Sequence, residues 1–392
     1  MSQVIYKERK NTDSNKWDNC KVQFGEENLL PFWVADMDFE VPTCVKDALQ
    51  RYVDFGVFGY YKPSEGYADA FIKWEASHHG YEVEKEWMRF APGVVPAVNW
   101  IIHILTEEGD PILINPPVYY PFKDALVNNK RRVVESPLVR TDAGYTFDFD
   151  DFEKKITEEG VKLFILCSPH NPVGRVWKPE ELQRVLDICK KQGVYVISDE
   201  IHQDLVMSGH HHTPAATVGD YDEMLITLTA ATKTFNLAAC QNSIVIIPNA
   251  SLRERYDEYQ ARIRVGSGNA FGYIAVQSAY ESGAEWLKEV LNIIEGNYHN
   301  LRETLTKALP KVWVSDLEGT YLMWIDLGGY LKPEEMKAVV QDECGLAVDY
   351  GSWFGEGENE TFIRVNLATK RELIETLAER LIEALRNRVE SE

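Results

Sequence analysis

Three polar residues that could share one chemical task each follow a short apolar run. Asn171 follows residues 161–167 (VKLFILC), Asp199 follows residues 194–198 (VYVIS), and Lys233 follows residues 224–229 (MLITLT). Runs of this kind are typical of strands that are buried on both faces. In an open sheet of parallel strands, ligands bind beyond the carboxyl ends of the strands. We therefore expect an amide, a carboxylate and an amine to lie at one edge of such a sheet.

Together, these three groups suit the chemistry of pyridoxal 5'-phosphate (PLP). A lysine amine forms a Schiff base with the cofactor. A carboxylate against the pyridine nitrogen keeps the ring protonated, so that the ring can accept electrons. An asparagine amide can donate a hydrogen bond to the phenolic oxygen. Each residue alone also fits a common turn or helix cap, so the prediction depends on all three together.

A phosphate site is predicted at the glycine turn in FAPGVVPAVNWIIHIL. Gly93 precedes an apolar helix that would begin at Val94 and Val95. Backbone amides at a helix N-terminus bind anions, so these two amides could hold the cofactor phosphate. A plain helix start is the alternative interpretation of the same turn.

Strands and helices alternate through the middle of the chain. Residues 111–115 and 243–247 are two further apolar runs of strand length. Between the runs at 161–167 and 194–198, the segment 178–193 (KPEELQRVLDICKKQG) predicts a helix, with a proline near its start and a glycine just past its end. Strand, helix and strand at this spacing indicate a mainly parallel sheet, and hence an α/β fold covered by helices.

The two ends of the chain have a different pattern. Residues 1–45 contain no regular alternation of strands and helices. After about residue 285 a long helical stretch precedes two strand-like segments, 321–328 and 362–368, and a final amphipathic helix. We expect a large domain over residues 46–285 and a smaller α+β domain built from residues 1–45 and 286–392.

The composition narrows the classes of partner. The 392 residues carry a formal net charge of −21, which argues against binding to nucleic acid or to anionic membranes. The sequence contains no apolar run of about 18 residues, and the first residues lack the apolar core of a signal peptide. We therefore expect a cytoplasmic protein without a membrane span.

Neither the cysteines nor the histidines suggest a metal site. The six cysteines form no C-x-x-C pair and are expected to be reduced and mostly buried. The run His210 to His212 lacks the spacing of zinc ligands, so we predict a surface loop there rather than a metal site.

Along nearly the whole chain, the sequence resembles the fold-type I PLP enzymes of the class I/II aminotransferase superfamily. Within them it is most similar to the carbon–sulfur β-lyase branch, the cystathionine β-lyases. The matching segments run in family order from residue 31 to residue 368: PFWVADMDFEVP, GVFGYYKP, APGVVPAV, NPPVYYPF, CSPHNPVGRVW, ISDEIHQDL, TKTFNLA and FIRVNLA. The segments WVADMDF and SDEIH are the most specific to the lyase branch.

The resemblance implies roles for the residues that would bind the cofactor. Lys233 would carry the cofactor as a Schiff base, Asp199 would pair with the pyridine nitrogen, and Asn171 would bond the phenolic oxygen. Tyr119 would stack on the ring and take part in catalysis. The phosphate would be held by the amides of Val94 and Val95, by Thr232, and by Tyr60 of the partner subunit in a homodimer with shared sites.

The substrate residues implied by the resemblance lie near the two ends of the chain. Arg364 would bind the α-carboxylate through a two-pronged guanidinium contact. Ala35 and Asp36 would also contact the substrate. A cation on the outward face of an alternating strand is the alternative interpretation of Arg364.

Two features depart from the common aminotransferase pattern. His202 stands where many aminotransferases have a cofactor-binding tyrosine, three residues after the aspartate. Ala230 and Gln241 stand where many have a serine and an arginine on the phosphate. The phosphate would therefore depend more on Thr232, the backbone amides and Tyr60.

The function that the resemblance implies is α,β-elimination from cystathionine or a similar cysteine thioether, giving a thiol, pyruvate and ammonia. An aminotransferase is the main alternative, because both reactions begin with loss of the α-proton and need the same lysine, aspartate and arginine. A ligand-sensing module without catalysis is a third class, but such regulators usually add an N-terminal DNA-binding domain, and this chain is acidic.

Overall fold

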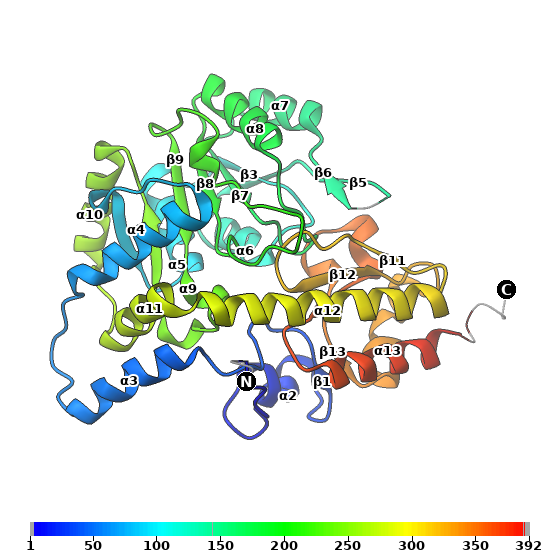
Figure 1. The fold of residues 1–392 in the computed structure, drawn as a ribbon. Coiled ribbons are helices and arrows are strands. Elements are labelled where there is room, and N and C mark those ends of the chain that lie inside the picture. The colour runs from blue at the N-terminus through cyan, green and yellow to red at the C-terminus, as the bar shows by residue number, and fades with distance from the viewer. Residues whose placement is uncertain (1–3, 143, 387, 389–392) are drawn as a thin grey trace.

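A seven-stranded sheet forms the centre of the computed structural model, which describes residues 4–142, 144–386 and 388 (Figure 1). The strand order is β2 (Met88–Ala91), β10 (Ser243–Ile246), β9 (Leu225–Thr229), β8 (Tyr195–Asp199), β7 (Leu163–Cys167), β3 (Pro111–Ile114) and β4 (Arg132–Glu135). Neighbouring strands from β9 to β4 are parallel, whereas β10 runs antiparallel to both β9 and β2. The five strands predicted in this region are confirmed, and with them the α/β fold class.

Both faces of this sheet are covered, as the near-continuous apolar runs predicted. Alternate side chains of β7 enter opposite cores: Leu163 and Ile165 belong to one cluster, Phe164 and Leu166 to another. The first cluster includes side chains of α5 (Val94–Leu105) and α6 (Tyr120–Asn128). The second includes side chains of α7 (Phe149–Glu158) and α8 (Pro179–Gln192). Apolar burial on both sides stabilises the central strands.

Helix α8 confirms the helix predicted for residues 178–193. It begins at Pro179, whose missing N–H costs nothing in the first turn. Gly193 ends it with a φ of 68°, a left-handed conformation that glycine adopts without strain. Four apolar side chains on one face of the helix are buried: Leu182, Val185, Leu186 and Cys189.

A second, smaller sheet lies beside the long helix α12 (Ala284–Ala308), with which it shares a buried core (Figure 1). Its strands run in the order β11 (Trp313–Val314), β12 (Leu322–Asp326), β15 (Phe362–Asn366) and β14 (Asp349–Tyr350). Helix α13 (Arg371–Arg386) follows the strands of this sheet and packs against α12. It confirms the amphipathic helix predicted near the end of the chain.

The N-terminal segment lies beside these C-terminal elements in Figure 1. It contains two short helices, α1 (Asn15–Asp18) and α2 (Cys20–Phe24), and strand β1 (Leu30–Pro31), which pairs in parallel with β13 (Leu346–Ala347). The division into a domain of residues 46–285 and a domain of 1–45 with 286–392 remains a prediction.

Four further helices complete the part of the chain around the large sheet. They are α3 (Thr43–Phe55), α4 (Glu65–His79), α10 (Ala250–Ile263) and α11 (Ala270–Ser282). Helix α11 packs against both α3 and α4. Within the described residues, no helix is long and apolar enough to cross a membrane.

Candidate active site

The three polar residues at or beyond the carboxyl ends of β7, β8 and β9 line one cavity of about 240 Å³. The strands are adjacent and parallel, and their register places Cys167 opposite Asp199 and Asp199 opposite Leu228. Their carboxyl ends therefore meet at one edge of the sheet. Asn171, Asp199 and Lys233 are brought together there, as the sequence predicted.

Lys233 lies in the short helix α9 (Ala231–Thr234), and its amine is enclosed by the protein. The Nζ atom donates a hydrogen bond to the carbonyl oxygen of Ala35 at 2.6 Å. The pKa of this amine is lowered to about 8: burial is the main cause and the charge of Arg364 adds to it, while the charges of Asp36 and Asp199 act in the opposite direction. A fraction of the amine is therefore neutral near pH 7, as a nucleophile or a base requires.

Asp199 ends β8 and is only 3% exposed. Its Oδ1 atom accepts a hydrogen bond from the backbone N–H of Ile201 at 3.1 Å. Burial raises the pKa of this carboxyl group to about 7. A cation placed against it would favour the ionised form, so the site is suited to a protonated ring nitrogen.

The start of α5 forms another wall of the cavity, to which Gly93, Val94 and Val95 contribute. The helix begins at Val94, as predicted, and Gly93 at the N-cap has no side chain that could cover the first amides. These amides have no acceptor within the helix, and the helix dipole favours an anion beside them. The hydroxyl-bearing Thr232 and Ser243 also line the cavity.

Ser243 is a lining residue that the sequence did not single out. It begins the apolar run of β10, and its buried hydroxyl has no hydrogen-bond partner among the described residues. Gln241 adopts a left-handed conformation, is exposed and does not line the cavity. Ser243 thus adds a hydroxyl group to the cavity close in sequence to Gln241, which replaces the arginine of many aminotransferases and does not line the cavity.

Tyr119 and His202 line the same cavity. Tyr119 is the N-cap residue of α6, and burial raises the pKa of its phenol. His202 is 3% exposed, and burial holds the pKa of its imidazole well below the usual value. His202 is therefore a neutral ring in this site and adds no positive charge.

Arg364 is buried, so its interpretation as an outward-facing cation on β15 is wrong. Its Nη1 atom donates to Asn171 Oδ1 at 2.9 Å, and its Nη2 atom donates to the carbonyl oxygen of Trp33 at 3.0 Å and to Asp349. Because Asn171 accepts through Oδ1, its amide Nδ2 remains available as a donor. Arg364 lies behind the walls of the 240 Å³ cavity and is not one of its lining residues.

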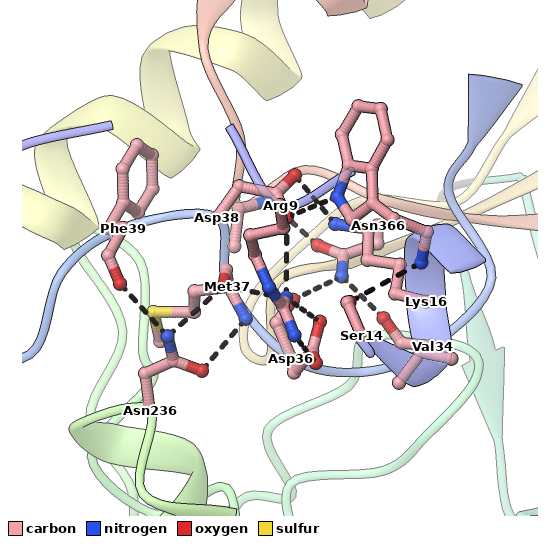
Figure 2. Close-up of polar contacts among 12 residues, drawn as sticks. Arg9, Ser14, Lys16, Val34, Asp36, Met37, Asp38, Phe39, Asn236 and Asn366 are labelled. Carbon is pink, nitrogen blue, oxygen red and sulfur yellow. Dashed lines mark hydrogen bonds and ion pairs between the residues drawn. The ribbon is translucent and has the colours of Figure 1, made fainter. Parts of the chain in front are cut away.

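The segment 34–39, which accepts the hydrogen bond of Lys233 at Ala35, is held by two asparagine side chains (Figure 2). Asn236 bonds the backbone of Met37 in both directions and also the carbonyl oxygen of Phe39, at 3.0 Å each. Asn366 donates to the carbonyl oxygens of Val34 at 2.7 Å and Asp36 at 2.6 Å. Ala35 lies between these contacts, and Tyr321 donates to its carbonyl oxygen at 2.8 Å.

Ion pairs fix the same segment from the other side (Figure 2). Arg9 makes two contacts of 2.7 Å with the carboxylate of Asp36. Lys16, which is fully buried, pairs with Asp38 at 2.9 Å. Asp36 thus directs its side chain to Arg9, whereas Ala35 is part of the cavity wall. The carboxylate of Asp36 is thus paired with Arg9, although its charge still acts on Lys233.

Tyr60 is fully exposed and does not line the cavity of its own chain. It lies between α3 and α4, next to the exposed Val57 and Phe58. The rings of Tyr52, Phe58 and Phe271 contact one another at centroid distances of 5.4 to 5.7 Å. The role of Tyr60 toward a partner subunit remains a prediction.

The histidine run is only partly the surface loop that was predicted. His210 and His211 are exposed, but His212 is 2% exposed and its Nε2 atom lies 3.0 Å from Glu200 Oε2. The expectation fails for His212 because a buried carboxylate supplies a partner for its ring. Among the described residues, no group of three or more histidine, cysteine, aspartate or glutamate side chains could hold a metal ion.

A mostly parallel seven-stranded sheet whose strand ends bring a half-buried lysine and a buried aspartate to one cavity is the arrangement of a fold-type I PLP-dependent enzyme. The chain belongs to the aminotransferase class I and II family, whose sequence pattern matches residues 27–381. Within this family it groups with the PatB- and MalY-type carbon–sulfur lyases.

Three relatives illustrate this grouping. Cystathionine beta-lyase PatB of Bacillus subtilis (strain 168) is 39% identical over 361 residues, which are 92% of this chain and 93% of that protein. The crystal structure of cystalysin from Treponema denticola, which contains PLP, has a TM-score of 0.94 at 35% identity and covers 98% and 99% of the two chains. The PLP-bound C-S lyase from Staphylococcus hominis has a TM-score of 0.92 at 33% identity, with 97% of each chain covered.

The cofactor is pyridoxal 5'-phosphate, and the donor set of the cavity fits it. The amine of Lys233 and the carboxylate of Asp199 face the same space as the uncapped start of α5. The unpartnered hydroxyl of Ser243 offers a further donor. An aldehyde, a ring nitrogen and a phosphate would each find a partner of suitable chemistry here.

Proposed function

We propose that this protein is a carbon–sulfur β-lyase that cleaves cystathionine or a similar cysteine thioether by α,β-elimination. The products would be a thiol, pyruvate and ammonia. The observation that carries the proposal is the buried Lys233 amine with its lowered pKa, which faces the same cavity as Asp199 in a chain 39% identical to a Bacillus cystathionine β-lyase.

We assign the cofactor contacts to residues that line the cavity. Lys233 would attach the cofactor, Asp199 would pair with the ring nitrogen, and Asn171 Nδ2 would donate to the phenolic oxygen. Tyr119 would lie against the ring, and His202 would contact it as a neutral group. The phosphate would be held by the amides of Val94 and Val95 and by the hydroxyl groups of Thr232 and Ser243.

Lys233 would act as the general base through its free amine. The bound cofactor supplies the electron sink for the negative charge that develops at the α-carbon. Lys233 Nζ would remove the α-proton, and the carbonyl oxygen of Ala35, 2.6 Å away, would hold the resulting ammonium. The electrons left at the α-carbon would form a double bond to the β-carbon, and the sulfur would leave with the C–S bonding pair as a thiolate. Water hydrolyses the remaining fragment to pyruvate and ammonia.

Arg364 would orient the substrate through its α-carboxylate, so that the Cα–H bond points toward Lys233. A planar guanidinium fixes a carboxylate by two parallel contacts, which sets its orientation as well as its position. The backbone of Ala35 and Asp36 would form the adjoining wall, because Asn366 and Arg9 hold that segment in place.

We also propose a homodimer in which Tyr60 reaches the phosphate of the partner's site. The full exposure of Tyr60 and the neighbouring exposed Phe55 and Phe58 support a covered surface in the assembled protein. A two-fold arrangement would give both sites the same contact.

An assay of the products tests the lyase proposal against transamination. L-Cystathionine is added to the holoenzyme with and without a keto-acid acceptor, and pyruvate, ammonia and free thiol are measured. We expect equal amounts of the three products without an acceptor. A keto acid that retains sulfur, formed only when the acceptor is present, would identify an aminotransferase instead.

A further inference from the structure

Arg364 has a buried acidic partner that neither the sequence motifs nor the reaction accounts for. Asp349 on β14 is the direct cross-strand neighbour of Arg364 on β15. Asp349 is 1% exposed and Arg364 is 2% exposed, and Arg364 Nη2 donates to Asp349 Oδ2. The other oxygen, Oδ1, is buried without a hydrogen-bond partner among the described residues. A buried ionised carboxylate with one unpartnered oxygen is costly, which argues against a purely structural role.

This pair leaves little of the guanidinium free for a substrate. Nη1 donates to Asn171, and Nη2 donates to both the Trp33 carbonyl and Asp349. Nε is buried without a partner in the described part of the chain. A two-pronged contact needs two N–H groups on one edge of the guanidinium. Both such edges of Arg364, Nε with Nη2 and Nη1 with Nη2, include Nη2, which already donates to Trp33 and Asp349. A substrate carboxylate must therefore share Arg364 with Asp349.

Among the described residues, Arg364 on β15 is the one cation paired with Asp349. The phenols of Tyr119 and Tyr120 at the start of α6 are close enough to feel the charge of Asp349. The pKa values of both phenols are raised, so both are neutral at physiological pH. Burial raises the pKa of the Asp349 carboxyl group to about 6, and the charge of Arg364 opposes that rise. Asp349 is thus ionised above pH 6 only with the help of Arg364.

We propose that Asp349 is the resident counter-ion of Arg364 and takes up a proton when the substrate's α-carboxylate binds to that arginine. Two carboxylates on one buried guanidinium cannot both stay ionised without a large cost. The proton comes from solvent and adds to Asp349, so no bond of the substrate changes. This inference rests on the proposed role of Arg364 in carboxylate binding, and it makes Asp349 a determinant of substrate affinity.

The pH dependence follows from this coupling. Below about pH 6 Asp349 is already protonated in the free enzyme, and carboxylate binding needs no proton. Above about pH 6 binding takes up close to one proton, so the affinity falls about tenfold per pH unit. The fall ends where Asp349 stays ionised in the complex as well.

The test uses 3-(methylthio)propionate, a thioether carboxylate without an amino group, which cannot react with the cofactor. Its binding to the holoenzyme is measured by titration calorimetry at pH 7.5 in two buffers of different ionisation enthalpy. On binding the probe, we expect the wild-type protein to take up one proton more than the Asp349→Asn variant does. At pH 8 the Asn variant should bind the probe about 10- to 100-fold more tightly than the wild type, and the difference should vanish near pH 5.5.

Asp326→Asn is the matched control, because Asp326 is an aspartate of the same small sheet whose ion pair is with Arg140 rather than with Arg364. It should leave both the proton count and the affinity unchanged. Equal proton uptake by the wild type and Asp349→Asn, or equal or weaker binding by that variant at pH 8, would overturn the inference. If Asp349→Asn does not fold, the wild-type affinity between pH 5.5 and 8 decides, because a flat profile contradicts the coupling.

The outcome is separate from that of the lyase proposal. The probe is unreactive, so proton uptake can be found in an enzyme that turns out to transfer amino groups. Conversely, pyruvate formation from cystathionine without proton uptake by Asp349 would uphold the function and reject this inference.

Discussion

Lys233 Nζ lies 2.6 Å from the carbonyl oxygen of Ala35, a residue 198 positions earlier in the chain. This contact joins the lysine at the edge of the large sheet to the segment held by Arg9, Asn236 and Asn366 (Figure 2). The amine is therefore positioned by both the large sheet and the N-terminal segment.

Lys233 should carry a chromophore in the purified protein. The attached cofactor should give a yellow protein that absorbs at about 410–430 nm, and borohydride should fix the cofactor to Lys233. Spectra and peptide mass spectrometry check this. Lys233→Ala is the control and should lose the borohydride-stable attachment. A colourless wild type that gains no absorbance from added PLP would reject the site.

Asp199→Asn should keep the fold but lose most of the activity. The variant cannot supply the negative charge that favours a protonated ring nitrogen. The activation free energy should therefore rise by several kcal/mol, and kcat/KM should fall on the order of a thousandfold. Steady-state kinetics with cystathionine measure the loss. The same change at Asp150, whose side chain is 99% exposed, should have no effect. Turnover of Asp199→Asn within threefold of the wild type would show that the role is misassigned.

Arg364→Lys should separate substrate binding from cofactor binding. Lysine keeps the charge but lacks the planar fork, so kcat/KM for cystathionine should fall by about 10²-fold or more. The absorbance of the bound cofactor should persist, and the products should remain pyruvate, ammonia and thiol. Arg140→Lys, at an arginine that pairs with Asp326, is the matched control and should behave as wild type. Near-normal kinetics of Arg364→Lys would rule out the carboxylate role.

Tyr60→Phe should weaken cofactor binding only if two chains share each site. The lost hydroxyl would remove one contact with the phosphate, so the dissociation constant of PLP should rise about tenfold, as for one hydrogen bond to a charged group. Tyr61→Phe, next to it but stacked on Tyr273, should bind PLP normally. Light scattering of the wild type should give a dimer, and a fully active monomer at dilute concentration would contradict the shared site.

Arg9→Met tests the N-terminal side of the site. The change leaves Asp36 without its two-pronged partner, so the segment that carries Ala35 should become less ordered. We expect kcat/KM to fall about tenfold while the cofactor absorbance stays. Lys7→Met breaks an exposed pair with Glu40 and should change the stability by less than about 0.5 kcal/mol and the activity not at all. Equal kinetics for both variants would show that the Arg9 pair does not position the lysine.

The central strands could be predicted because each is a near-continuous apolar run. The edge strands β2 and β4 could not, since RVVE at Arg132–Glu135 mixes charged and apolar residues. At an edge only one neighbouring strand buries the residues, so the pattern that reveals a central strand is diluted. Helix α8 was predicted almost to its ends because proline and glycine mark both of them.

Parts of the site were predictable where a residue type follows a strand end, as Asp199 and Lys233 do. Asp349 and Ser243 gave no such signal, because a single acid or hydroxyl near a strand is common. The pairing of Asp349 with Arg364 depends on strand register, and the hold of Asn366 on Asp36 joins residues 330 positions apart. Contacts of that range follow from the assembled fold and leave no local pattern in the sequence.

The hydrogen bonds from Asn366 to the segment 34–39 have a consequence for biosynthesis. A chain emerging from the ribosome exposes Asp199 and Lys233 long before Arg364 and Asn366 are made, and domains fold in the order of synthesis. The large sheet can therefore form with the lysine in place while the wall that carries Ala35 still lacks its partner from β15. A nascent or truncated chain that ends before residue 362 would carry Lys233 without Arg364 and Asn366, so under the proposed roles of these residues we expect it to be catalytically silent.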